Sequence, residues 1–431
     1  MKKFILLTTL ILVIALTTAC TGEPGPQGPI GVAGPPGQAG PAGADGLPGV
    51  SGADGRDGED GVSYTPPNYV GAEACEECHE DIYKSFMKTG HPYKLNKVVD
   101  GQRPKYPYSE VNKPPEGYTW DDISYVIGGY GWKARFIDKE GYIITGADED
   151  AQTQYNLYNK DLDMGDNWVG YHAGEENVPY DCGSCHTTGY DDEEGTHQDG
   201  LPGIVGTWVE PGVQCEECHG PGENHVNNPK LVSVKVDRDA EACGKCHVRG
   251  DVTEIDASGG FIKHHEQYEE LFESKKRVMD CIDCHDPHQS VKYAKGLGIK
   301  TACENCHFEN VDLQKITDRK HAECVDCHMP RVTKSALGDL ERFSGDLRTH
   351  LMAINPRSLT QFDEEGAVSK PYLSLDFACK SCHYEGGSAT VESDEVMMEF
   401  AIGHHDRDLV GSYNEGNQEE QPEEKSSSNN K

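Results

Sequence analysis

The chain contains eight copies of one short motif, Cys-x-x-Cys-His, numbered 1 to 8 in chain order. In this motif two thiols reach the two vinyl groups of one porphyrin, and the adjoining histidine ligates the iron, so the sequence predicts eight covalently bound c-type haems. The cysteine pairs are Cys75 and Cys78, Cys182 and Cys185, Cys215 and Cys218, Cys243 and Cys246, Cys281 and Cys284, Cys303 and Cys306, Cys324 and Cys327, and Cys379 and Cys382. The motif histidines are His79, His186, His219, His247, His285, His307, His328 and His383.

Cys-x-x-Cys pairs also occur in zinc sites and in thioredoxin-like redox sites, which are the alternatives to haem attachment. Every pair in this chain is followed directly by histidine, and sixteen of the seventeen cysteines lie in the motifs. Thioether bonds to haem would use these thiols, so we expect no disulfides even in an oxidising compartment.

The N-terminus has the pattern of a secretory signal peptide, residues 1–19, with a charged start, a short apolar stretch and small residues before Cys20. The apolar stretch is shorter than the roughly 20 residues of a membrane span. A cysteine after small residues is typical of a bacterial lipoprotein, which predicts a lipid-anchored N-terminus at 20–21; an ordinary signal peptide with an incidental cysteine is the alternative. We expect an exported protein, an outer-membrane or cell-surface lipoprotein, or else a periplasmic or extracellular one.

Glycine occupies every third position of residues 22–61, with many prolines between. Because only glycine fits the axis of a collagen triple helix, this period predicts a collagen-like stalk and a possible homotrimer. A monomeric polyproline-like spacer is the alternative, since acidic side chains in the later triplets would repel one another in a trimer. Residues 413–431 contain almost no apolar side chain, which predicts a disordered acidic tail.

The remaining body, residues 69–412, contains all eight motifs. The whole chain is only 35% hydrophobic, so we expect the porphyrins to supply much of its core. We predict a mostly α fold with much irregular loop, cored by haem, and a small β-hairpin region at Trp132–Gly146, where apolar and polar residues alternate around a turn. Residues Glu392–Gly403, acidic at first and apolar later, are expected to form a helix.

Eleven of the nineteen histidines lie outside the motifs, enough to give each of eight irons a second axial ligand. Two pairs are adjacent, His264 with His265 and His404 with His405, so one member of each pair is expected to ligate a given iron. The predicted second ligands are His91, His172, His225, His265, His288, His321, His350 and His404.

Several runs resemble secreted multihaem cytochromes of the cytochrome c-554 type, which are related to extracellular cytochromes of metal-reducing bacteria. These runs are GGYGWKARFIDKEGYIITG, YDCGSCHTTGY, GVQCEECHGPGENHV, ACGKCHVRG and CVDCHMPR. The resemblance covers about residues 70–356, and its most specific unit is CHGPG followed by a histidine. It implies stacked haems with mostly bis-histidine iron. The distal roles that it implies belong to His91, His225, His288, His321 and His350. The collagen-like stalk is not part of the family pattern.

The formal net charge of −35 argues against a nucleic-acid partner and favours a basic redox partner protein or another extracellular electron acceptor. We expect an electron-transfer protein rather than a catalytic enzyme, and assign no catalytic residues. One alternative is an octahaem oxidoreductase with one open haem that acts on a small nitrogen or sulfur compound. Another is a subunit of a cytochrome filament.

Overall fold

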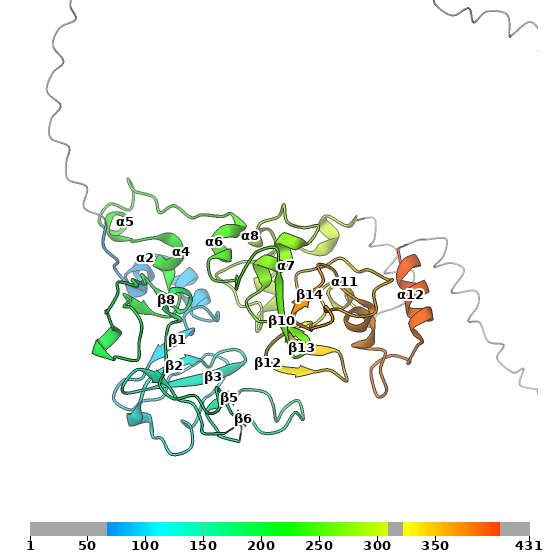
Figure 1. Cartoon of the computed structure of the whole chain (residues 1–431). Coiled ribbons are helices and arrows are strands. Elements are labelled where there is room, and N and C mark those ends of the chain that lie inside the picture. The colour runs from blue at the N-terminus through cyan, green and yellow to red at the C-terminus, as the bar shows by residue number, and fades with distance from the viewer. Residues whose placement is uncertain (1–66, 149, 309–321, 406–431) are drawn as a thin grey trace, which may run out of the picture. The chain divides into compact units, whose positions relative to one another are not determined.

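The computed structural model describes residues 67–148, 150–308 and 322–405 (Figure 1). The chain divides into two compact units, residues 1–64 and residues 65–431. The predicted signal peptide, the predicted anchor at Cys20, the collagen-like segment and the acidic tail lie outside the described residues, as does His321. The elements below all belong to the second unit.

A seven-stranded sheet lies in the long interval between motifs 1 and 2 and runs in the order β1-β2-β3-β4-β7, with β5 and β6 added at β3. The strands are β1 (Leu95–Lys97), β2 (Ile123–Gly128), β3 (Lys133–Asp138), β4 (Tyr142–Ile143), β5 (Gln154–Asn156), β6 (Trp168–Val169) and β7 (Val178–Pro179). Strands β3 and β4 are antiparallel, with Ile137 opposite Ile143, so the predicted hairpin is present as part of a larger sheet.

Apolar side chains cover both faces of this sheet, because alternate residues of a strand point to opposite sides. Tyr125 and Ile137 pack on one face with Tyr180 and Trp208. Val126 and Phe136, both fully buried, pack on the other face in a second cluster. The sheet therefore has its own protein core.

A second sheet has five strands in the order β13-β12-β11-β10-β14, and a third has two, β8 and β9. The strands are β8 (Thr187–Thr188), β9 (Glu210–Pro211), β10 (Ile255–Ser258), β11 (Phe261–Ile262), β12 (Thr333–Asp339), β13 (Ser344–Leu347) and β14 (Val368–Ser369). Ile255, Phe261 and Ile262 from the second sheet form a third apolar cluster with Leu373 and Phe377. Contacts join the first two sheets, since Trp132 Nε1 donates to the Asp346 carbonyl oxygen at 3.3 Å.

The helices are short, and most carry or adjoin a Cys-x-x-Cys-His motif. They are α2 (Ala72–Phe86), η1 (Trp120–Asp122), α3 (Gly183–His186), η2 (Gln198–Gly200), α4 (Cys215–His219), α5 (Glu223–Asn227), α6 (Ala240–Gly244), α7 (Gln267–Glu273), α8 (Cys281–Cys284), α9 (Lys295–Gly298), η3 (Cys303–Asn305), α11 (Cys324–His328), η5 (Asp376–Lys380) and α12 (Asp394–Gly403). The last of these agrees with the helix predicted at Glu392–Gly403. Figure 1 shows α4, α5, α6 and α8 away from strands β2, β3, β5 and β6 of the first sheet.

The prediction of a mostly α fold is wrong, because the described residues form fourteen strands in three sheets. The error came from assigning much of the core to porphyrin. Where motifs are far apart along the chain, as between Cys78 and Cys182, the intervening segment pairs its own strands and buries its own apolar side chains. Helix is the main secondary structure only at the Cys-x-x-Cys-His motifs. Within the described residues, no helix is both long and apolar enough to span a membrane.

Candidate haem sites

Each motif lies in or beside a short helix. In a helix, residues three apart are neighbours on one face, so the two cysteines of each motif can point the same way. The sixteen motif cysteines are exposed or half-buried, and none forms a disulfide. In motif 1 the helix α2 is interrupted at His79, whose backbone dihedrals (φ −116°, ψ 40°) are not helical. Thiols available for attachment and a histidine turned off the helix axis are what covalent haem binding requires.

Five motif histidines face a histidine from elsewhere in the chain, with ring centroids 5.9–6.3 Å apart. The pairs are His79 with His225 at 6.3 Å, His219 with His288 at 6.2 Å, His247 with His91 at 6.3 Å, His285 with His350 at 6.0 Å, and His328 with His405 at 5.9 Å. Metal–imidazole bonds are about 2 Å long, so an iron between two imidazoles places the ring centroids about 6 Å apart. By contrast, the neighbouring rings of His264 and His265 are 4.1 Å apart. The five pairs fit bis-histidine haem iron.

Hydrogen bonds at the Nδ1 atom orient several of these rings. The Nδ1 atom of His225 lies 2.7 Å from the Val232 carbonyl oxygen, and that of His328 lies 2.8 Å from the Met352 carbonyl oxygen. A carbonyl can only accept, so the proton belongs on Nδ1 and leaves Nε2 free to bind a metal. His383 of motif 8 has the same arrangement with the Thr390 carbonyl oxygen at 2.6 Å.

The His285–His350 pair depends on a buried carboxylate. Glu270 on α7 is fully buried and accepts a hydrogen bond from the His350 backbone N–H at 2.5 Å. Its other oxygen accepts from the Thr333 hydroxyl on β12 at 3.0 Å. The carboxylate therefore fixes the segment that carries His350 against α7 and the second sheet.

The cysteines of neighbouring motifs lie close to one another. Three pairs of thiols are hydrogen-bonded: Cys75 with Cys215, Cys185 with Cys246, and Cys243 with Cys281. In four further pairs the charge of one cysteine raises the pKa of the other, which indicates that the two lie near each other: Cys243 near Cys218, Cys303 near Cys284, Cys303 near Cys324, and Cys327 near Cys379. These contacts give the spatial order of motifs 1, 3, 4, 5, 6, 7 and 8, with motif 2 as a branch at motif 4. The spatial order differs from the chain order only at motif 2.

Two positively charged side chains act on the histidine of motif 2. Burial, and then the charges of Lys94 and Arg135, lower the pKa of His186 to about 3. Burial, and then Lys94, lower the pKa of His265 to about 2. Burial, and then Lys133, lower the pKa of His264. In the part of the chain that the structure describes, no aromatic ring is paired with His186, so this motif differs from the five above.

Two arginines of this group of positive charges, Arg135 and Arg249, have contacts of their own. The Arg135 guanidinium stacks on the Tyr171 ring at 3.5 Å, and its Nε donates to the Gln154 side-chain oxygen at 2.7 Å. Arg249 Nε lies 3.3 Å from an oxygen of the fully buried Glu266. Burial, and then a hydrogen bond to Glu269, raise the pKa of Glu266 to about 9, which favours the protonated form of this carboxyl at pH 7.

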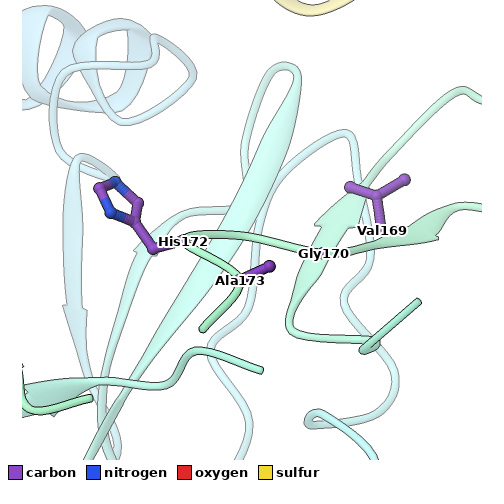
Figure 2. Close-up of a pocket in the computed structure, with 4 residues that line it drawn as sticks. All are labelled: Val169, Gly170, His172 and Ala173. Atoms are coloured by element: carbon purple, nitrogen blue, oxygen red, sulfur yellow. The ribbon is translucent and has the colours of Figure 1, made fainter. Parts of the chain in front are cut away.

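The other predicted second ligands lie elsewhere. His172 occupies a loop after β6 and lines a cavity of about 390 Å³ with Val169, Gly170 and Ala173 (Figure 2). Its Nδ1 atom lies 2.9 Å from a carboxylate oxygen of Glu175, and its ring contacts Tyr171 rather than a motif histidine. Figure 2 shows the imidazole projecting from this loop.

At the end of α12, His405 rather than His404 faces His328. The His404 ring lies against Phe400, with centroids 4.8 Å apart. His307 of motif 6 has no ring opposite it among the described residues, but its Nε2 atom lies 3.1 Å from Lys276 Nζ.

Family models match two parts of the chain. The model "Cytochrome c554 and c-prime" matches residues 151–220, which contain motifs 2 and 3. The collagen triple helix repeat matches residues 19–66. The chain resembles multihaem c-type cytochromes. Its N-terminal segment matches a collagen-like repeat.

Two comparisons concern the octahaem sulfite reductase MccA of Wolinella succinogenes. The curated sequence, a dissimilatory sulfite reductase, is 21% identical over 368 residues, which cover 62% of this chain and 51% of that protein. The chain thus spans about half the length of this relative. The solved structure has a TM-score of 0.52 and 17% identity, over 84% of this chain and 73% of that one. The outer cell wall cytochrome OcwA has a TM-score of 0.49 and 19% identity, over 80% of this chain and 89% of that one.

The sequence analysis missed four residues that lie near motif histidines in the structure. They are Lys94, Arg135, Lys276 and His405. The three cations carried no motif signal, since isolated lysines and arginines in a chain of this length are usually surface residues. His405 was weighed against His404, and the sequence offered no means of choosing between them.

Proposed function

We propose that this chain transfers electrons through eight covalently bound c-type haems, as a conduit to an extracellular acceptor or a redox partner protein. Each bound haem supplies a one-electron iron couple. The observation that carries the proposal is the set of five facing histidine pairs, because two imidazoles on one iron leave no position for a substrate.

The chain's residues would hold and order the cofactors. The motif cysteines attach the porphyrins, and the motif histidines ligate one side of each iron. His91, His225, His288, His350 and His405 would ligate the other side of five of them. The hydrogen bonds and electrostatic interactions between cysteines of neighbouring motifs support a continuous series of attachment points, which conduction through a protein would require.

The haem count is tested by the intact mass of the full chain purified from a host with a haem-attachment system. We expect the mass of the processed chain plus eight haems. A mass with fewer than eight haems, with the remaining motif cysteines free or in disulfides, would contradict the attachment that the motifs predict.

A second candidate function is the reduction of a small oxyanion at motif 2, and the cationic cluster favours it. Lys94 and Arg135 place positive charge around His186 in a chain whose net charge is −35. Such a cluster would attract and orient an anion, and MccA is a sulfite reductase by name. His265 would stand beside this site rather than close it, in contrast to its predicted ligand role.

Anion binding can be measured by titrating the oxidised full chain with sulfite or nitrite and following the haem absorption. We expect Lys94→Gln and Arg135→Gln each to weaken binding about tenfold or more, because a hydrogen bond to a charged group contributes about 1.5–3 kcal/mol. The control is Lys139→Gln, at an exposed position of the β3–β4 turn. Equal binding in all three variants, or no binding to the wild type, would rule out this second function.

Placement outside the cell follows from the predicted signal peptide and the collagen-like repeat, and we propose a surface lipoprotein anchored at Cys20 and trimerised through residues 22–61. Three chains in register would bury the glycine at every third position. Sedimentation of the full chain and of a variant lacking residues 22–61 distinguishes a trimer from a monomeric spacer.

A further inference from the structure

Tyr130 lies in the loop between β2 and β3 and is only 5% exposed. Its hydroxyl donates to the Lys88 carbonyl oxygen at 2.6 Å and lies 2.8 Å from the Oγ atom of Ser290, which is also buried. Because the tyrosine proton is used at a carbonyl, which can only accept, the Ser290 hydroxyl donates to Tyr130. One buried hydroxyl therefore joins two segments that are far apart in the chain.

Each of these two segments carries a histidine that faces a motif histidine. Lys88 precedes His91 by three residues. Ser290 follows His288 by two residues. His91 faces the histidine of motif 4, and His288 faces that of motif 3. Motifs 3 and 4 are neighbours in the spatial order, so Tyr130 connects the segments that carry the expected second ligands of two adjacent haems.

The position of Tyr130 is itself fixed from several sides. The Tyr93 ring stacks on the Tyr130 ring, with centroids 5.6 Å apart and an interplanar angle of 2°. Gly90, the residue before His91, packs closely on the same ring, since a Cβ atom added there would lie 3.1 Å from it. The Tyr293 hydroxyl donates to the Tyr130 carbonyl oxygen at 3.0 Å. A side chain held in this way can hold the two histidine segments in turn.

Phe86, at the end of α2, lies beside both histidines. Its ring centroid is 6.4 Å from that of His91 and 6.3 Å from that of His288. The two imidazole planes are nearly perpendicular, at 89°, in the pair at motif 4 and closer to parallel, at 25°, in the pair at motif 3. The angle between the imidazole planes on a ferric haem sets the anisotropy of its low-spin signal in electron paramagnetic resonance. The two haems are therefore expected to give different signals, each sensitive to the rotation of its second ligand.

We propose that Tyr130 is a positioning residue that sets the orientation of His91 and His288, the second ligands of two adjacent haems. It acts through the segments that carry these histidines and not as a ligand. The proposal rests on the bis-histidine ligation proposed above. Because both ligands depend on one hydroxyl, its removal is expected to alter the motif 3 and motif 4 haems together.

The test is electron paramagnetic resonance of the oxidised, haem-loaded full chain with Tyr130→Phe, which keeps the ring and removes the hydroxyl. We expect two low-spin signals to shift and the others to keep their wild-type positions. In Ser290→Ala only the signal of the motif 3 haem is expected to shift, because the bond to Lys88 remains. The matched control is Tyr125→Phe, at a buried tyrosine of β2 whose hydroxyl donates to Asp199 at 2.5 Å, and it is expected to shift neither signal.

His91→Ala and His288→Ala assign the two signals, because each is expected to convert one low-spin haem into a high-spin haem. If neither variant gains a high-spin haem, the bis-histidine ligation fails, and this result does not depend on Tyr130. Unshifted signals in Tyr130→Phe, or equal shifts in Tyr125→Phe, would overturn the positioning role. If Tyr130→Phe does not retain eight haems by intact mass, Ser290→Ala decides, and an unshifted motif 3 signal in that variant would overturn the proposal.

Discussion

A chain in which serine replaces Cys243 and Cys246 is expected to mature with seven haems and to lose rapid electron exchange between its two ends. Motif 4 is the junction of the spatial order. Its Cys243 is hydrogen-bonded to Cys281 of motif 5 and lies near Cys218 of motif 3, while its Cys246 is hydrogen-bonded to Cys185 of motif 2. Among the described cysteines, no other thiol pair joins motifs 1, 2 and 3 to motifs 5 to 8.

The rate of electron transfer between the haems can be measured after the exposed Asp81, beside motif 1, is replaced by cysteine and labelled with a photosensitiser. Under illumination, all eight haems of the otherwise unaltered chain are expected to be reduced in one fast phase. In the variant that lacks the motif 4 haem, only the haems of motifs 1 and 3 should be reduced in the fast phase. The reduction rate of the other haems should be lower by several orders of magnitude.

The matched control replaces Cys379 and Cys382 by serine. Motif 8 lies at the end of the spatial order and touches only Cys327 of motif 7 in the contacts above. This variant also loses one haem, but its remaining seven should be reduced in one fast phase. Equal kinetics in the two variants would mean that motif 4 is not the junction.

Replacement of Glu216 by alanine is expected to lower the free energy of unfolding by about 3 kcal/mol. This glutamate, inside motif 3, is only 3% exposed. Its carboxylate accepts from the backbone N–H groups of Val70 at 3.0 Å, Gly71 at 2.8 Å and Gly222 at 2.7 Å. Each buried N–H left without an acceptor costs about 1–3 kcal/mol, and three are lost together. The carboxylate also joins the start of α2, with motif 1, to the loop after motif 3.

Glu217 is the control for this prediction, because it neighbours Glu216 in the same motif and accepts one exposed hydrogen bond, from the Gly189 N–H at 3.1 Å. We expect Glu217→Ala to cost about 1 kcal/mol or less. Guanidinium unfolding of the haem-loaded chains, followed by far-ultraviolet circular dichroism, measures both. Similar losses for the two variants would contradict the role assigned to Glu216.

The haem-attachment motifs could be predicted from the sequence, and so could many of the histidines that face them in the structure. His225 follows motif 3 by a short turn, and His288 follows motif 5 by three residues; the structure places them opposite His79 and His219. Their positions near motifs made them recognisable. The motif that each would serve was not predictable, because both face a motif other than the one they follow.

Single-residue choices could not be made from the sequence. Adjacent helical residues differ by about 100° in direction, so the last turn of α12 decides between His404 and His405, and no composition signal records that angle. His172 was predicted as a ligand only because eight irons need eight second ligands. In the structure its side chain pairs with Glu175.

The sheets were missed for a different reason. Strands such as β5 and β6 are only three and two residues long, and their partners are distant in the chain. Short strands carry little alternation, and their pairing is set by tertiary packing more than by local propensity. Only β3 and β4, which are adjacent and joined by a tight turn, showed a clear alternation of apolar and polar residues in the sequence.

The central claim is that this chain holds a series of haems whose irons are mostly ligated on both sides. It is tested most directly by electron paramagnetic resonance of the oxidised full chain, with carbon monoxide titration of the reduced form. The five facing histidine pairs predict at least five low-spin haems and therefore no more than three carbon monoxide sites among eight. Carbon monoxide binding at four or more haems, with matching high-spin signals, would contradict the account.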